Sequence, residues 1–138
     1  MQRKNQKGIL AVEFAILLPV FVLLIFGVVE FSLALYDKAM LTNASREGAR
    51  AGIVFREPSC LSYGEIKNVV ISYLGTHLIT FGNAAEPTVT VEPTTCPDPG
   101  GSKKVTVSYN YEFLVLPNFI NSLIGGITLT GETIMRME

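Results

Sequence analysis

The chain has 138 residues, and its 11 Lys and Arg against 12 Asp and Glu give a formal net charge of −1. This balance leaves no basic stripe for a phosphate backbone, so we exclude nucleic acid as a partner. The residues after Tyr36 are enough for one small domain but not for two.

A basic leader precedes a long apolar segment. The first eight residues carry three basic side chains and no acid, and Glu13 is the only charged residue from Ile9 to Val29. A helix over this segment would be about 31 Å long, enough to cross the ~30 Å hydrocarbon core of a bilayer. Because positive charge beside a span stays in the cytoplasm, we expect a cytoplasmic N-terminus and an extracytoplasmic C-terminal part. The expected divisions are a basic leader peptide (1–8), a transmembrane helix (9–36), a juxtamembrane helix extension (37–56) and an extracytoplasmic head (57–138).

Two features of the apolar segment leave alternatives open. Ser32-Leu33-Ala34 has the small residues that a signal peptidase needs. The segment is, however, longer than the ~7–15 residues of a signal-peptide core, which argues against release of a soluble domain.

Glu13 is costly in a bilayer, where an ionisable group near a helix centre costs ~2.5–3.5 kcal/mol. Its carboxylate either reaches the cytoplasmic headgroups or neutralises an α-amino group, such as one created by cleavage after Gly8.

The start of the apolar segment resembles the cleavage motif of type IV prepilins, through Gly8, Ile9-Leu10-Ala11-Val12 and Glu13-Phe14. A longer pattern resembles the TadE-like family, which comprises pseudopilins or minor pilins of the tight-adherence (Flp) pilus machinery. That pattern consists of Gly8, Val12-Glu13-Phe14-Ala15, Leu18-Pro19, Gly27, Glu30-Phe31, Leu35-Tyr36 and Ala44-Ser45-Arg46-Glu47-Gly48-Ala49-Arg50-Ala51-Gly52.

The resemblance is close over residues 7–56, and it implies processing between Gly8 and Ile9 by a prepilin peptidase. It also implies that Glu13 acts in assembly by pairing with a neighbouring α-amine. Phe14 stands where the major Flp pilins carry tyrosine, and the chain is much longer than those pilins, so the resemblance points to an accessory pilin. The implied partners are other pilins and pseudopilins, the inner-membrane assembly platform and the lipid bilayer of a bacterial inner membrane.

The apolar helix is predicted to continue over residues 9–55, with a kink at Pro19. Ala44, Gly48 and Gly52 repeat every four residues, so small side chains line one face of this helix. Such a face lets another backbone approach closely. The approaching partner is either the protein's own sheet or a second pilin helix.

Arg46 and Arg50 share an adjacent face of the same helix. Glu47 could pair with Arg50, although an exposed pair of this kind contributes only ~0.3–0.5 kcal/mol. The two arginines could instead meet lipid phosphates.

The two cysteines, Cys60 and Cys96, both lie in the predicted extracytoplasmic part, and an even number there predicts one disulfide. Two free thiols are the alternative, in a host without periplasmic oxidation. His77 is the only histidine, so we expect no metal site and assign His77 to a helix C-terminus, where it would interact with the helix dipole. The sequence has no motif of a hydrolase, a metalloprotease or a nucleotide site, so we expect no enzyme activity, no catalytic residues, no cofactor and no small-molecule substrate.

In the head, Ser62 and Glu65 have the spacing of a capping box, which predicts a second helix that ends near Ile79. Its expected apolar stripe comprises Ile66, Val69, Val70, Tyr73, His77 and Leu78. Alternating side chains predict strands at 88–92, 104–113 and 127–137, the last with a bulge at Gly131. Residues 114–126 are expected to form a short helix whose apolar side chains meet a partner, the membrane surface or the core, namely Phe119, Ile120, Leu123 and Ile124.

These elements predict an α+β fold: a long N-terminal transmembrane helix that continues into a stalk, a second short helix and a small three-stranded antiparallel sheet. Such a head on a helical stalk is typical of pilin-like proteins. The predicted function is that of a pseudopilin in tight-adherence pilus assembly. The alternative is a single-pass, membrane-anchored binding domain with no role in a pilus.

Overall fold

The computed structural model describes residues 6–54, 60–75, 77–79, 86–113 and 125–137. Its elements are α1 (Gln6–Ile53), α2 (Tyr63–Leu74), β1 (Thr88–Glu92), β2 (Ser102–Tyr111) and β3 (Ile127–Arg136). This confirms the predicted α+β class, with one long helix, one short helix and three strands. The short helix predicted within 114–126, with its side chains Phe119, Ile120, Leu123 and Ile124, lies almost entirely outside the described residues.

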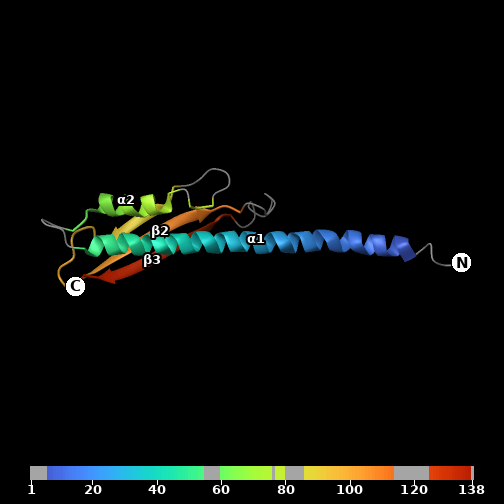
Figure 1. Cartoon of the computed structure of the whole chain (residues 1–138), viewed down its shortest axis with the longest axis horizontal. Coiled ribbons are helices and arrows are strands. Elements are labelled where there is room, and N and C mark those ends of the chain that lie inside the picture. The colour runs from blue at the N-terminus through green and yellow to red at the C-terminus, as the bar shows by residue number, and fades with distance from the viewer. Residues whose placement is uncertain (1–5, 55–59, 76, 80–85, 114–124, 138) are drawn as a thin grey trace.

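α1 consists of two halves with different surroundings. Its N-terminal half projects alone, whereas α2 and the sheet gather along its C-terminal half (Figure 1). The helix runs without a break through Pro19, and from Ile9 to Val29 almost every side chain is exposed. Glu30, which is only 2% exposed, is the first buried side chain. The helix is long and apolar enough to cross a membrane.

The three strands form one antiparallel sheet in the order β1-β2-β3. Val107 in the central strand pairs with Val89 of β1 and with Gly131 of β3. Side chains of β2 alternate strictly between buried and open positions, because successive residues of a strand point to opposite faces. Both helices pack on the buried face, and the core comprises Ala34, Leu41, Ala44, Ala49, Ile66, Val70, Leu74, Val89, Val91, Val105, Val107, Tyr109 and Tyr111.

The predicted bulge at Gly131 is wrong. Pairing between β2 and β3 continues without interruption through Val107 and Gly131. The glycine is instead required by α1, because a Cβ at Gly131 would lie 2.5 Å from the carbonyl carbon of Leu41. Ser45 of α1 adds a polar contact with this strand, since its hydroxyl lies 2.7 Å from Thr133 Oγ1.

α2 begins as predicted and ends earlier than predicted. Ser62 is the N-cap, and its reciprocal bonds with Glu65 complete a capping box. The helix ends at Leu74 rather than near Ile79, because Gly75 adopts a positive φ of 43°, a conformation that glycine reaches without strain.

The buried stripe of α2 also differs from the prediction. It consists of Ile66, Val70 and Leu74, whereas Tyr73 is 39% exposed. Beyond the helix end, the His77 backbone N–H donates to the Leu74 carbonyl oxygen at 2.8 Å. The His77 Nδ1 lies 3.1 Å from the same oxygen, so His77 does sit at the helix C-terminus.

The strand predicted at 104–113 occupies Ser102–Tyr111 instead. This shift of two residues brings Lys103 into the sheet, where its side chain is fully buried. Phe113 follows the strand and remains partly buried against the core. The strand predicted at 127–137 ends at Arg136, and the one at 88–92 has the predicted bounds.

Candidate functional site

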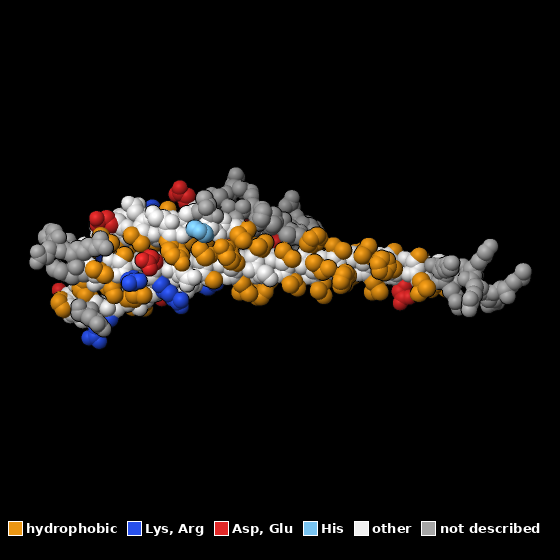
Figure 2. All heavy atoms as spheres, viewed as in Figure 1, with side chains coloured by type: hydrophobic (Ala, Val, Ile, Leu, Met, Phe, Trp, Pro, Cys, Tyr) orange, Lys and Arg blue, Asp and Glu red, His pale blue; other side chains and the backbone are white. Residues whose placement is uncertain are grey.

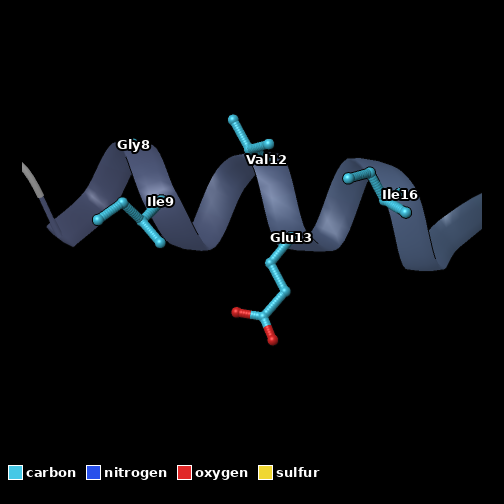
Figure 3. A pocket seen from close by; sticks show the side chains of 5 residues that line it. All are labelled: Gly8, Ile9, Val12, Glu13 and Ile16. Atoms are coloured by element: carbon cyan, nitrogen blue, oxygen red, sulfur yellow. The ribbon is translucent and has the colours of Figure 1, made fainter.

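The first exposed turns of α1 carry the predicted processing and pairing residues. Gly8, Ile9, Val12, Glu13 and Ile16 line one shallow region of the helix surface. Figure 3 shows the Glu13 side chain extending away from the helix, on the side opposite Val12, with apolar side chains before and after it. Among the described residues, Glu13 makes no hydrogen bond or ion pair. Its carboxylate is therefore available to a partner outside the chain.

Gly8 has no packing role inside the described part of the chain. A Cβ built at Gly8 would meet no atom within 4 Å. Ile9, the next residue, is 67% exposed. A larger side chain at position 8 would therefore fit this fold, so any need for glycine there comes from a molecule that contacts the helix from outside.

The small-residue stripe has a different explanation. Ala44, Gly48 and Gly52 are all buried, and they face the protein's own head. A Cβ at Gly48 would lie 2.5 Å from Val70 Cγ2 of α2 and 3.3 Å from Val105 Cγ1 of β2. Of the two predicted partners for this stripe, the structure shows the protein's own sheet, and it adds α2, which was not predicted as a partner.

Arg46 and Arg50 lie on the opposite, exposed side of α1 together with Glu47. The only ion pair within the described part of the chain joins Lys104 and Glu132, whose charged atoms lie 2.9 Å apart. The two arginines are therefore free to contact another molecule. Arg46 follows Val29 by about 25 Å of helix, which is too far for contact with lipid phosphates if the apolar segment spans a bilayer.

A buried polar contact joins α1 to the head where the apolar segment ends. Glu30 and Tyr111 are each 2% exposed, and the Tyr111 hydroxyl donates to Glu30 Oε1 at 2.5 Å. Burial raises the pKa of Tyr111, and the hydrogen bond to Glu30 raises it further. The ring of Phe113 packs edge-on against Tyr111, with centroids 5.9 Å apart. The sequence placed Glu30 in the family pattern but gave it no partner, because the tyrosine lies far along the chain.

Asp37 is the second buried acid of α1, and its side chain is 0% exposed. Its Oδ1 accepts the backbone N–H of Ile79 at 2.9 Å, while its buried Oδ2 has no hydrogen-bond partner among the described residues. Burial raises the pKa of Asp37, and the bond from Ile79 opposes that rise. Asp37 is about two helical turns after Glu30, so both acids face the head from one side of α1.

The disulfide between Cys60 and Cys96 is confirmed, with Cα atoms 5.6 Å apart. It joins the segment before α2 to the loop after β1. Lys103 lies in the strand that follows this loop, and its Nζ donates to the Thr95 carbonyl oxygen at 2.8 Å. Burial lowers the pKa of Lys103. Both contacts hold the loop to the head, and the sequence predicted only the first.

The described residues contain no group of three or more His, Cys, Asp and Glu side chains that could hold a metal ion. What they present is a surface: a long apolar half-helix, and a head on whose visible face basic and acidic side chains are exposed (Figure 2). Such an arrangement suits insertion and assembly.

Comparison with known proteins connects these features with one family. Residues 8–50 match the family model described as TadE-like protein. The match begins at the glycine of the predicted cleavage site and ends in the small-residue stripe. It therefore covers most of residues 7–56, over which the sequence resembles this family. No curated protein and no solved structure matches the chain.

Proposed function

Because residues 8–50 match the TadE-like family, which suggests a role in tight-adherence pilus assembly, we propose that this chain is a pseudopilin, or minor pilin, of such a system. The observation that carries the proposal is the form of α1. One uninterrupted helix has an exposed apolar half and a second half that forms part of the core of the head. A pilin needs both: a segment that resides in the membrane and then packs among other helices, and a head that folds on the same helix.

The apolar half would span the bacterial inner membrane once, with the basic leader in the cytoplasm and the head outside. The disulfide between Cys60 and Cys96 supports an extracytoplasmic head, because such bonds persist in oxidising compartments. The other pilins and the inner-membrane assembly platform would be its partners.

Processing by a prepilin peptidase would occur between Gly8 and Ile9. No packing contact within the described chain requires glycine at position 8. This supports the proposed processing, because the small residue would then serve a contact with another protein. Cleavage would leave a positive α-amino group on Ile9, one helical turn before Glu13. The Glu13 carboxylate, free of partners in the described chain, would neutralise that group on its own chain or on a neighbouring subunit.

The N-terminal sequence and intact mass of the protein from its native membranes test the proposal. A start at Ile9 is the expected result. A start at Met1 would favour the plain membrane-anchored binding domain instead, and a start at Leu35 would mean that the apolar segment was a signal peptide. Gly8→Leu should block the cleavage without unfolding the head, because position 8 is open to solvent.

A further inference from the structure

The outward side of α1 remains apolar after the head has begun on the other side. Phe31, Leu35 and Tyr36 are 65%, 53% and 43% exposed. On the inward side of the same turns, the two acids Glu30 and Asp37 are buried against the head. The head therefore starts within the apolar surface of the helix rather than beyond it.

Burial of both acids lengthens the uncharged surface of the helix. After Glu13, the first exposed charged side chain on α1 is Lys38. The helix between these two residues is about 37 Å long, which exceeds the ~30 Å hydrocarbon core of a bilayer. If Ile9 begins at the cytoplasmic boundary, Val29 reaches the outer one, and the turns from 30 to 36 extend about 10 Å farther.

A bilayer with its headgroups is about 40–45 Å thick, so about 5–8 Å of headgroups cover the outer boundary. The turns from 30 to 34 lie in this layer, and Leu35 and Tyr36 lie at its outer edge. The side chains at that level suit the region. Tyrosine is enriched at membrane interfaces, where its ring and hydroxyl face different surroundings. Tyr36 supplies one such ring on the exposed side.

The polar groups at this level are shielded from lipid. The Glu30 carboxyl group accepts from Tyr111 under the head at 2.5 Å, and Asp37 accepts from the Ile79 N–H at 2.9 Å. Glu30 lies at the inner edge of the headgroup layer, where an exposed carboxylate would border the hydrocarbon core and raise the cost of insertion. Its burial leaves a surface that lipid can cover.

We propose that the end of the head around Glu30 and Tyr111 is seated in the extracytoplasmic headgroup layer, with Phe31 and Leu35 in contact with lipid. The proposal rests on the membrane span of the proposed function. In this arrangement the head touches the bilayer and is not held above it on a free stalk. Extraction of the protein from the membrane during assembly therefore requires removing the end of the head from lipid as well as the span.

The chain contains no tryptophan, so a single introduced indole reports its own depth. The full chain is reconstituted in phosphatidylcholine vesicles that carry bromine either near the headgroups or deep in the acyl chains. Four exposed positions are compared. Phe31→Trp and Leu35→Trp test the proposal, Phe21→Trp reports the middle of the span, and Ile134→Trp, at a position 60% exposed on β3, is the matched control on the head.

We expect shallow bromine to reduce the fluorescence of the Phe31→Trp and Leu35→Trp variants more than deep bromine does. The reverse is expected for Phe21→Trp, and no loss is expected for Ile134→Trp. Quenching at positions 31 and 35 by aqueous iodide, with position 21 still quenched by lipid, would overturn the seating while leaving the span intact. Protection of both positions from bromine and iodide would mean that a second copy covers them, which also overturns it. Absence of lipid quenching at position 21 would instead show that the span of the proposed function is wrong.

Discussion

Asp37 illustrates how a single buried group on α1 connects stability to pH. Its carboxyl group is fully buried, accepts one hydrogen bond and leaves one oxygen without a partner among the described residues. Burial favours the neutral form, so the pKa of Asp37 is raised in the folded protein. The folded state therefore binds this proton more tightly than the unfolded chain does.

We predict that Asp37→Asn reduces the pH dependence of the free energy of unfolding. The contribution of protonated Asp37 is fully present below the unfolded pKa of about 3.9 and is lost as the pH rises through the folded pKa. Asparagine keeps an oxygen for the Ile79 N–H and does not titrate. Denaturant titrations of the full chain in detergent, between about pH 4 and pH 7, would show less loss of stability for the variant.

Asp98→Asn, at an exposed position, is the matched control for this charge change. The two variants should differ in the slope of stability against pH. If their slopes agree with each other and with that of the unmodified chain, the buried carboxyl does not titrate differently in the folded state.

Gly131 gives a second test at the level of one residue. A Cβ there would lie 2.5–2.6 Å from backbone atoms of Leu41 and Thr42, which cannot move as a side-chain tip can. Gly131→Ala should therefore destabilise the head by about 1–3 kcal/mol or more, as overpacking does. Gly64→Ala, where a Cβ meets nothing within 4 Å, should be neutral or slightly stabilising, because alanine favours a helix. Equal thermal midpoints for the two variants would contradict the close approach of α1 to β3.

At the scale of elements, local patterns predicted the strands and helix starts better than the ends. Thr88–Glu92 alternates and forms β1 with the predicted bounds, and the capping box at Ser62 correctly starts α2. Apolar periodicity beyond Leu74 suggested a longer helix, but the turn at Gly75 ends it. Periodicity alone does not show which of two signals prevails at a boundary.

Contacts between distant segments were beyond prediction from one sequence. The sequence does not show the approach of α1 to Gly131, so the glycine was predicted to form a bulge. The buried partner of Glu30 lies 81 residues away along the chain. For the small-residue stripe, the sequence left two partners open, and only the structure places the protein's own head against it. The processing and pairing roles of Gly8 and Glu13 stay predictions.

The disulfide supports a prediction about the link between α2 and the sheet. Cys60 and Cys96 are separated by 36 positions, and closing a loop of that size stabilises a fold by roughly 4 kcal/mol in the chain-entropy model. Cys60→Ser with Cys96→Ser should lower the free energy of unfolding by an amount of this order. Reductant should destabilise the unmodified chain similarly and leave the double variant unchanged. Stability that is insensitive to both treatments would show that the bond does not constrain the unfolded chain.

At the scale of the whole molecule, α1 presents different surfaces along its length. From Ile9 to Val29 it exposes apolar side chains, and from Leu41 to Gly52 one face is buried in the head while the other carries Arg46 and Arg50. A helix with this division can exchange lipid for other helices along its first half without disturbing the head. Any contact made by the arginines would then lie between heads, outside the membrane.

The same division predicts what loss of the Glu13 charge does. Glu13→Ala should leave insertion and head stability unchanged, because Glu13 makes no hydrogen bond or ion pair in the described chain and alanine is cheaper in a bilayer. Pilus assembly should be lost, because the α-amino group left by processing would remain uncompensated among apolar helices. Glu13→Gln should fail in the same way if charge, rather than hydrogen bonding, is what matters. Surface pili would be counted by electron microscopy and the protein in membranes by immunoblot.

Glu47→Ala is the matched control, since Glu47 is an exposed glutamate on the same helix but beside the head. Its pili should remain at normal number. If cells with Glu13→Ala also form pili at the normal level while cells lacking the protein do not, the protein acts in assembly without pairing its carboxylate. If cells lacking the protein still assemble pili normally, the chain has no required part in the fibre, and membrane anchoring is the function that α1 supports.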